Sequence, residues 1–244
     1  MRIEVISIFP QMFDEPMSLS IIGRARTFGL LDFRAYDLRD WTHDRHRTTD
    51  DEPYGGGQGQ LMKVEPVFEA LDELLDEEKG PATVICFAPH GETFNQSLAA
   101  EFATHERLIL VCGRYEGFDE RVYTRVDRII SMGDYILTGG ELPAMILTDA
   151  VCRLLPGALG DDQSNIDESF ANGLLEYPQY TRPAQYRDLA VPDVLLSGDH
   201  ARIAAWRRIM SIMRTAQFRP DLLATTVLSE EERRLAASEA IERE

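Results

Sequence analysis

The stretch Ser131–Gly160, SMGDYILTGGELPAMILTDAVCRLLPGALG, shapes the interpretation of the whole chain. A strand is expected to end at its first residues, and Gly133 then starts a turn. A glycine pair, Gly139–Gly140, follows the largely apolar tetrapeptide Tyr135–Thr138, and an apolar helix bounded by prolines comes next. Two glycine turns around such a tetrapeptide let the backbone approach a flat ligand closely. The alternative is a buried strand, a turn and a core helix without a ligand.

Outward from this stretch, strands and helices alternate along residues 1–160. Apolar and β-branched runs predict strands at Ile3–Phe9, Leu31–Tyr36, Thr83–Ala88, Leu108–Cys112 and Arg128–Ser131. The apolar spacing predicts helices at Met17–Arg26, Val64–Glu78, Ser97–His105, Asp119–Val126 and Ala144–Leu155. This alternation indicates an α/β fold with a mostly parallel sheet. The loops after the last three strands then meet at the carboxyl ends of the strands, where such sheets bind ligands.

A long polar connection, Asp37–Met62, joins the second strand to the next helix, and connections of this length are usually functional or disordered. It contains the glycine run Gly55–Gly59 and two histidines, His43 and His46. Metal ligation by these histidines is the weaker interpretation, because an HxxH pair without the HExxH helix is a poor signal. The chain has no GxGxxG after a strand, no P-loop and no GxSxG elbow, which disfavours dinucleotide, nucleoside triphosphate and serine hydrolase chemistry.

The length and the cysteines limit the class of protein. With 244 residues the chain can form one large domain or two. No apolar run approaches the ~18 residues of a membrane span, and the N-terminal RIEVISIF is too short for a signal peptide. The three cysteines, Cys86, Cys112 and Cys152, lie far apart in apolar segments. This spacing disfavours a disulfide scaffold or a zinc ribbon and indicates a reducing cytoplasm.

The charges are distributed unevenly. Of 25 basic and 42 acidic residues, residues 173–244 hold 10 and 11, which leaves 15 and 31 in residues 1–172. The stretch His200–Pro220 carries five arginines and no acidic residue. The overall acidity disfavours non-specific nucleic-acid binding, whereas a local arginine face is compatible with a specific contact. A solvated arginine surface is the alternative interpretation of that face.

Residues 161–172, DDQSNIDESFAN, lack periodicity and predict an interdomain linker. A proline-punctuated arm, Leu174–Pro183, follows, and Ser197–Asp199 caps a further helix. That helix is expected to pack through an apolar stripe of Ile203, Trp206, Met210 and Met213. A capping box at Ser229–Glu232 predicts the start of the last helix.

Several long motifs occur in order along most of the chain. They are DDEPYGGGQGQLMKVEP, CGRYEGFDERV, SMGDYILTGGELPAMILTDAV with its RLLPG continuation, LEYPQYTRP, and VLLSGDH leading into IAAWR. Together they resemble the bacterial tRNA (guanine-N1)-methyltransferases, the TrmD family of the SPOUT superfamily. These enzymes methylate the guanosine at position 37, beside the anticodon. The motifs are long and contiguous, so the resemblance is specific.

The resemblance implies three parts of the chain. They are a SPOUT-type α/β domain over residues 1–160, with a mostly parallel sheet and a deep C-terminal trefoil knot, a flexible linker over 161–172, and a small helical tRNA-binding domain over 173–244. It also implies a cytoplasmic homodimer, without a membrane segment, in which the partner subunit completes each active site. The apolar surface of Ala144–Leu155 suits a twofold interface.

S-adenosylmethionine is the methyl donor that the resemblance implies, bound in a bent form at the knot. By matching motif positions, its pocket comprises Pro89, Gly113, Tyr115, Glu116, Met132, Gly133, Tyr135, Leu137, Gly139, Gly140 and Pro143. Backbone-rich turns suit an adenine edge, and Ile136 and Leu137 are expected to supply apolar walls. A divalent ion, usually Mg²⁺, assists the family, but the sequence shows no dedicated set of ligands for one.

The resemblance also assigns catalytic roles. Guanine N1 carries a proton, so a general base must remove it, and a guanidinium stabilises the charge that spreads to O6. Arg153 occupies the family's arginine position. The family's base is an aspartate directly before a Ser-Phe pair, and this chain has Glu168 there. Glutamate is longer by about 1.5 Å, so either Glu168 acts as the base from a shifted backbone or the neighbouring Asp167 does. Glu168, at the matching position, is the first candidate and Asp167 the second.

RNA contacts are expected on the second domain, with the target base extruded into the knot pocket. The expected contact residues are Arg182, Arg202, Arg207, Arg208 and Arg214. Two alternatives stay open at the level of sequence. One is another SPOUT methyltransferase that acts on a ribose 2′-hydroxyl or a different base. The other is a non-catalytic RNA-binding relative, which only the glutamate at position 168 motivates.

Overall fold

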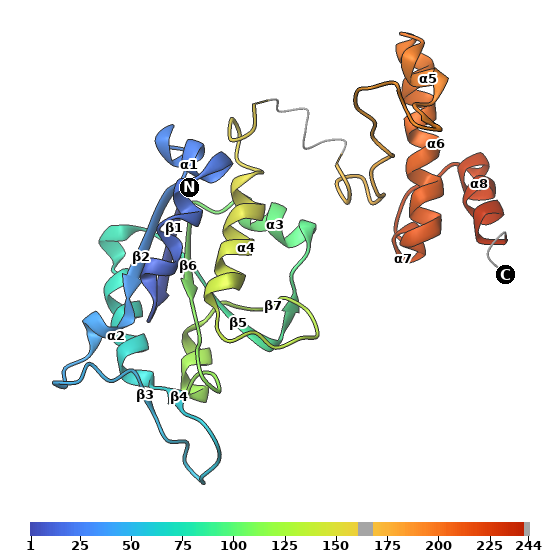
Figure 1. The fold of residues 1–244 in the computed structure, drawn as a ribbon. Helices are drawn as coiled ribbons and strands as arrows, with labels where there is room; N and C mark the ends of the chain where they lie inside the picture. Colours follow the sequence, from blue (N-terminus) through green and yellow to red (C-terminus); the bar gives the residue numbers. More distant parts are fainter. Residues whose placement is uncertain (161–167, 242–244) are drawn as a thin grey trace. The chain divides into compact units, whose positions relative to one another are not determined.

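The computed structural model describes residues 1–160 and 168–241 of the chain. The chain divides into two compact units, Met1–Asp161 and Asp162–Glu244. The first unit holds a parallel sheet with helices on both faces, and the second is mainly helical (Figure 1). Each unit is described by itself.

A five-stranded sheet forms the centre of the first unit. All of its strands run parallel, in the order β2-β1-β6-β5-β7. The strands are β1 (Arg2–Ser7), β2 (Asp32–Asp37), β5 (Thr83–Thr93), β6 (Arg107–Val111) and β7 (Arg128–Ser131). The register places Val5 of β1 between Ala35 of β2 and Leu110 of β6. The predicted α/β class with a parallel sheet is confirmed, and the knot stays a prediction.

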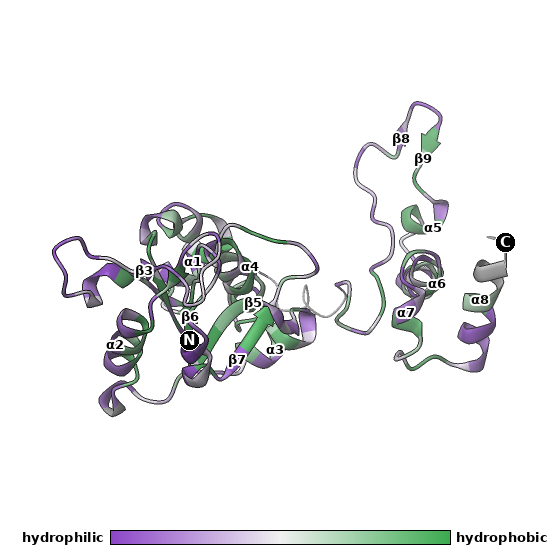
Figure 2. Cartoon of the chain, turned by 90° about the horizontal axis from the view of Figure 1, so that it is seen from below, coloured by the Kyte–Doolittle hydropathy of each residue, from purple (hydrophilic) through white to green (hydrophobic). Residues whose placement is uncertain are grey.

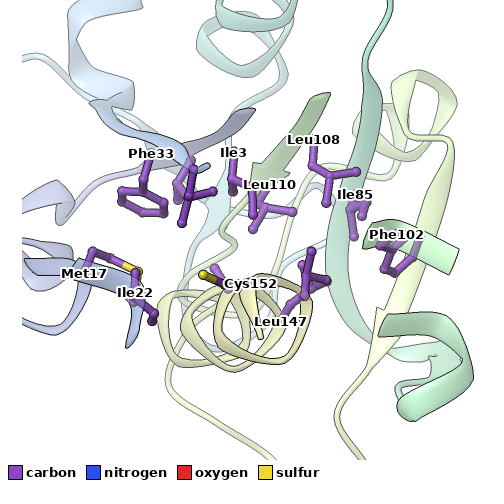
Figure 3. Close-up of a cluster of buried hydrophobic side chains, with 14 of the residues drawn as sticks. Ile3, Met17, Ile22, Phe33, Ile85, Phe102, Leu108, Leu110, Leu147 and Cys152 are labelled. Atoms are coloured by element: carbon purple, nitrogen blue, oxygen red, sulfur yellow. The ribbon is translucent and has the colours of Figure 1, made fainter. Parts of the chain in front are cut away.

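Helices cover both faces of this sheet. One face packs against α1 (Ser20–Thr27), α3 (Gln96–Ala103) and α4 (Glu141–Cys152), and the other against α2 (Val64–Leu74). The strand period of two explains this division, because Ile3 and Val5 of β1 enter the first cluster whereas Ile6 enters the second. Figure 3 shows Leu147 and Cys152 of α4 facing Ile3 and Leu110. Hydropathy follows the same plan, with apolar residues along β5 and β7 (Figure 2).

Strand β5 is longer than the sequence predicted. It does not end at Ala88 but continues through Pro89 to Thr93. Its pairing with β7 shifts register between Phe87 and Glu92, so Pro89 lies in a bulge and not in a free loop. Proline and glycine are ordinarily turn signals, and the periodicity of the strand is lost at the bulge. The predicted strand end was therefore wrong.

Two further segments differ from the sequence-based prediction. Residues Glu120–Arg125 form a 3₁₀ helix where an α-helix was expected. The long polar connection contains a short antiparallel pair, β3 (Asp50–Asp51) with β4 (Leu61–Met62). The glycine run therefore lies between two paired strands, which fixes the two ends of the loop.

The second unit is organised around one long helix. Its helices are α5 (Asp193–Leu196), α6 (His200–Phe218), α7 (Pro220–Leu223) and α8 (Glu230–Ile241), with a small hairpin of β8 (Gln185–Tyr186) and β9 (Leu189–Ala190). The core is small and consists of Leu174, Ile212, Ala216, Leu228 and Ala236. The residues of the predicted Trp/Met stripe are only half-buried. The deepest packing of α6 lies nearer its carboxyl end, at Ile212, Thr215 and Ala216.

The predicted capping box is confirmed at the start of α8. The Ser229 hydroxyl accepts a hydrogen bond from the Glu232 amide at 3.2 Å, and the Glu232 carboxylate accepts one from the Ser229 amide at 2.8 Å. Two amides that the helix leaves unpaired are thereby satisfied. Glu232 also accepts from the Arg208 guanidinium at 2.7 Å, which ties α8 to α6.

Candidate functional site

The turns that follow β6 and β7 are joined by hydrogen bonds. The Gly140 amide donates to the Gly113 carbonyl at 2.8 Å, and Arg114 pairs with Gly139 in an isolated antiparallel bridge. We call this feature the crossed turns, residues 113–117 and 132–140. The structure therefore brings together three residues that the sequence assigned to the cofactor pocket, Gly113, Gly139 and Gly140.

Lack of space at the crossing requires glycine. A Cβ atom on Gly140 would lie 2.8 Å from the Cα atom of Cys112 and 3.0 Å from the amide nitrogen of Gly113. A Cβ atom on Gly139 would lie 2.5 Å from a carboxylate oxygen of Glu141. Real Cβ atoms essentially never come closer than 3.0 Å to such atoms, and those facing Gly140 are backbone atoms, so a larger residue at Gly140 would push the two turns apart.

The glycine-rich connection holds the neighbouring residues Tyr115 and Glu116. Tyr115 has φ +59°, a left-handed conformation that is costly for a residue with a side chain. Burial, followed by the charge and hydrogen bond of Asp50, raises the pKa of Tyr115 above its usual value. The Glu116 amide donates to the Gln60 carbonyl at 3.0 Å, and a Cβ atom on Gly59 would lie 2.5 Å from the Glu116 side chain. The connection and the crossed turns thus form one structure, which the sequence did not reveal.

A buried carboxylate lies beneath the crossed turns. Glu141, the first residue of α4, has a side chain that is only 1% exposed. It accepts hydrogen bonds from the Ser7 hydroxyl at 2.7 Å and from Nε of Arg114 at 3.0 Å. The Arg114 guanidinium carbon lies 4.7 Å from the centre of the Phe9 ring. Sequence reasoning missed this group, although a glutamate in the first turn of an otherwise apolar helix was an available signal.

The tetrapeptide between the glycine turns does not close the site within one chain. Tyr135, Ile136 and Leu137 are exposed, and Ile136 keeps 82% of its surface in solvent. The apolar walls expected from Ile136 and Leu137 are therefore not formed by this chain alone. Pro143 is buried in α4, and Pro89 lies in the bulge of β5.

One stripe of α4 faces solvent. Its residues are Leu142, Ile146 and Asp149, and the partly exposed Arg153 continues the stripe as the C-cap. Gly140 is the N-cap of the same helix, so Arg153 lies roughly 20 Å along the axis from the crossed turns, at 1.5 Å per residue. The structure does not bring the predicted catalytic arginine to the crossed turns of its own chain.

The candidate base Glu168 belongs to the second unit, and Asp167 lies outside the described residues. The Phe170 amide donates to the Leu174 carbonyl at 2.8 Å, and the Leu175 amide donates to the Thr215 hydroxyl on α6 at 2.8 Å. Residues 168–172, predicted as part of a flexible linker, therefore form a hydrogen-bonded turn anchored near α6.

A groove of about 250 Å³ lies between this turn and the first half of α6. Its lining residues are Glu168, Asn172, Leu174, Leu175, Tyr177, His200, Ile203, Ala204, Arg207, Arg208 and Ser211. The groove brings the candidate base together with two of the arginines that the sequence assigned to RNA contact. The carboxylate can accept a proton, and the neighbouring guanidinium groups can donate hydrogen bonds to phosphate or carbonyl oxygens.

The five predicted RNA-contact arginines have different surroundings. The Arg207 guanidinium lies 4.6 Å from the centre of the Tyr177 ring, and Arg208 is paired with Glu232. This pair, with the Ser229 amide, lowers the pKa of the Glu232 carboxyl to about 2. The remaining three, Arg182, Arg202 and Arg214, are exposed.

Other titratable groups carry structural roles. Within residues 1–160 and 168–241, no three His, Cys, Asp or Glu side chains gather as a metal site. His43 instead contacts Glu69 at 2.7 Å. Burial raises the pKa of the Cys86 thiol to about 12 and that of Cys152 to about 11, so these thiols are unreactive. No helix in the described part of the chain is long and apolar enough to cross a membrane.

The chain is similar to known proteins over nearly its whole length. Residues 1–225 match the family model described as tRNA (Guanine-1)-methyltransferase TrmD. The chain is 51% identical over 237 residues to the tRNA (guanine-N(1)-)-methyltransferase of Dehalococcoides mccartyi, covering 96% of this chain and 95% of that protein. It is 53% identical over 236 residues to the protein of the same name from Moorella thermoacetica, covering 96% and 94%. The chain therefore belongs to the tRNA (guanine-N1)-methyltransferase family.

Proposed function

We propose that this member of the tRNA (guanine-N1)-methyltransferase family transfers the methyl group of S-adenosylmethionine to N1 of guanosine 37 in tRNA. The observation that carries the proposal is the crossing of two glycine turns at the carboxyl ends of β6 and β7, where open α/β sheets bind ligands. The names of the relatives support both the base and the RNA class. We place the enzyme in the cytoplasm, where its tRNA substrate and reduced thiols are found.

The residues at the crossed turns fit the methyl donor. The backbone of the crossed turns around Gly113, Gly139 and Gly140 suits the polar edge of an adenine, since no side chain separates the two turns there. Glu116 carries a negative charge suited to the ammonium of the methionyl end, and the connection holds it in place. When bound, S-adenosylmethionine supplies a methyl group on a sulfonium, which is the electrophile of the reaction.

The acid–base chemistry depends on the second unit. Glu168 is the proposed general base, with Asp167 as the second candidate, and it removes the proton from N1 so that the lone pair becomes available. Negative charge then spreads to O6 of the guanine. The Arg153 guanidinium stabilises that charge by a hydrogen bond, which is the role of an oxyanion-hole donor.

A homodimer is proposed because one chain does not bring Arg153 to its own crossed turns. Arg153 lies at the far end of α4 from the crossed turns of its own chain, and Leu142 and Ile146 are exposed between them. If two α4 stripes pack antiparallel about a twofold axis, each Arg153 lies beside the crossed turns of the other subunit. The same contact covers the exposed tetrapeptide Tyr135–Thr138 and closes the apolar walls.

RNA binding is proposed for the second unit. Its exposed arginines, Arg182, Arg202 and Arg214, contact phosphates of the anticodon stem, together with Arg207 and Arg208 at the groove. The first unit carries most of the net negative charge, so these arginines are needed to bring RNA to the site. The target base leaves its stack to reach the methyl donor.

The direct test is methylation of unmodified tRNA that carries guanosine at position 37. The protein is incubated with methyl-labelled S-adenosylmethionine, with and without Mg²⁺, and the RNA is digested for nucleoside analysis. The proposal predicts labelled 1-methylguanosine, and no label in tRNA with adenosine at position 37. A label on a ribose 2′-oxygen or on another base would assign the chain a different RNA methylation. Donor binding without any label would instead indicate a non-catalytic relative.

A further inference from the structure

Strand β6 has an arginine at each end, and each arginine is paired with a buried glutamate. Arg107, the first residue of β6, donates to Glu4 at 2.6 Å, and both side chains are nearly buried, at 4% and 2% exposure. Arg114, just past the other end, donates to Glu141 at 3.0 Å, with 18% and 1% exposure. The two pairs share chemistry and burial but lie at opposite ends of the sheet.

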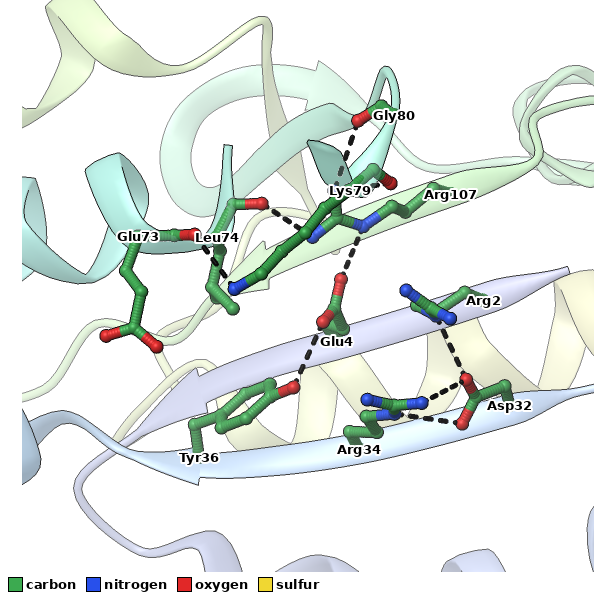
Figure 4. Close-up of polar contacts among 10 residues, drawn as sticks. All are labelled: Arg2, Glu4, Asp32, Arg34, Tyr36, Glu73, Leu74, Lys79, Gly80 and Arg107. Atoms are coloured by element: carbon green, nitrogen blue, oxygen red, sulfur yellow. Dashed lines mark hydrogen bonds and ion pairs between the residues drawn. The ribbon is translucent and has the colours of Figure 1, made fainter. Parts of the chain in front are cut away.

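The pair at the amino end joins secondary structure. Besides Glu4, Arg107 donates to the Leu74 carbonyl at 2.7 Å and to the Gly80 carbonyl at 3.2 Å (Figure 4). Glu4 also accepts from the Tyr36 hydroxyl at 3.0 Å. These contacts satisfy carbonyls at the carboxyl end of α2 and connect β1, β2 and β6. None of these residues belongs to the crossed turns.

The pair at the carboxyl end joins the crossed turns themselves. Arg114 lies in the first turn, and its Nη1 donates to the Thr138 carbonyl of the second turn at 3.4 Å. Glu141 follows directly after Gly140 and accepts from Ser7 at the end of β1. The end of β1, the turn after β6 and the start of α4 therefore meet at one carboxylate, whose two oxygens each accept one hydrogen bond.

We propose that Glu141 and Arg114 are positioning residues that set the affinity for the methyl donor by holding the crossed turns at their separation. This inference rests on the proposed function, because it assumes that the crossed turns bind S-adenosylmethionine. Neither residue is assigned a contact with the reacting atoms. The pair acts through the backbone of Gly113 and Gly140, which are joined by the 2.8 Å hydrogen bond.

Replacing Glu141 by glutamine keeps the shape of the side chain and removes its charge. The Arg114 guanidinium then loses the carboxylate that compensates it in a mostly buried place, and an amide NH₂ can face its Nε–H. Solvation of that guanidinium is regained only if the first turn moves away from the second. The expected consequence is a site that binds the donor more weakly while the general base and the RNA surface are unchanged.

The experiment compares Glu141→Gln with the matched control Glu4→Gln in the full-length protein. Dissociation constants for S-adenosylmethionine are measured by calorimetry and those for tRNA by filter binding, alongside thermal unfolding and steady-state kinetics. Both variants are expected to unfold at a lower temperature than the wild type, because each leaves a buried arginine without its carboxylate. Only Glu141→Gln is expected to weaken donor binding, by at least ~10-fold, with kcat at saturating donor and tRNA affinity unchanged.

A milder variant covers the case in which Glu141→Gln does not fold. Ser7→Ala removes one of the two hydrogen bonds to Glu141 and keeps the ion pair, and it is expected to weaken donor binding by roughly 3- to 10-fold. Equal donor affinities in Ser7→Ala, Glu4→Gln and the wild type would overturn the inference, as would equal losses in the two glutamine variants. If the wild type itself does not bind S-adenosylmethionine, the proposed donor fails and the inference falls with it.

Discussion

The two units of this chain meet their proposed ligands in opposite ways. In the first unit the crossed turns are fixed before any ligand binds, by the Gly140–Gly113 hydrogen bond and by the buried Glu141. In the second unit the groups proposed to act on RNA lie on an exposed helix face and around an open groove, over a small apolar core. A small-molecule donor is usually bound in a preformed site, whereas an RNA loop is bound by side chains that can adapt. The comparison predicts that changes in each unit affect different steps.

The largest effect is expected at the candidate base in the second unit. Glu168→Gln should lower kcat by ~10²–10⁴-fold, because N1 of guanine then keeps its proton. Donor affinity should stay at the wild-type value, since Glu168 is proposed to contact N1 of the guanine and not the donor. Single-turnover methylation and donor calorimetry measure the two quantities. Asp167→Asn is the matched variant. Full activity of both variants would contradict the assignment of either carboxylate as the general base.

A slightly smaller loss is expected for Arg153, which belongs to the first unit but not to its preformed part. Arg153→Ala should lower kcat by roughly 10²-fold, because one donor to O6 is lost in the transition state. Donor affinity should again be unaffected, since Arg153 is proposed to contact O6 of the guanine and not the donor. Mixing this variant with Glu168→Gln and assaying the heterodimers tests whether the two residues act from different subunits. Unchanged turnover in Arg153→Ala would contradict the role.

Charge reversal on the second unit should separate RNA binding from donor binding. The double variant Arg202→Glu/Arg214→Glu should weaken tRNA binding by roughly 10- to 100-fold and reduce its dependence on salt, because fewer counterions are released. The double variant leaves donor affinity unchanged. Arg24→Glu, an exposed arginine of α1, is the control for a general charge effect. Equal tRNA affinities in the wild type, the double variant and Arg24→Glu would show that the arginine face is only a solvated surface.

The smallest effect concerns the stability of the second unit alone. Ser229→Ala removes half of the capping box and should cost about 1 kcal/mol of unfolding free energy, with no change in donor affinity.

The capping box should also make the stability of the second unit depend on pH. Because the pKa of the Glu232 carboxyl is lowered to about 2 from an ordinary 4.5, the contribution of Glu232 to stability is complete above about pH 4.5 and is lost as the pH falls towards 2. Denaturant unfolding of the wild type and Glu232→Gln across this range measures it. A Glu232→Gln difference that does not shrink on acidification would contradict the assignment.

The sequence predicted what depends on nearby residues. The capping box involves positions three apart, and the alternation of strands and helices in the first unit follows from local periodicity, so both were foreseeable. The glycine turns were foreseen for the same reason. Their crossing was expected only as a gathering of loops, since the hydrogen bond itself joins positions 27 residues apart.

The groups that sequence reasoning missed have distant partners. Glu141 accepts a hydrogen bond from Ser7, 134 residues away in the sequence. The turn that contains Glu168 is held near α6 by the hydrogen bond from Leu175 to Thr215, which are 40 residues apart. No spacing rule covers such contacts, because they depend on how the sheet and helices pack. The bulge at Pro89 was missed because proline and glycine carry the same signal in a bulge as in a turn.

The crossed turns are proposed to bind the methyl donor because their backbones approach without side chains between them. The decisive quantity is the dissociation constant of S-adenosylmethionine for Gly140→Ala, with Gly160→Ala as the control, since a Cβ atom there meets open space. We expect at least ~10-fold weaker binding for Gly140→Ala and wild-type binding for Gly160→Ala. A wild-type dissociation constant in Gly140→Ala would refute the proposed role of the crossed turns.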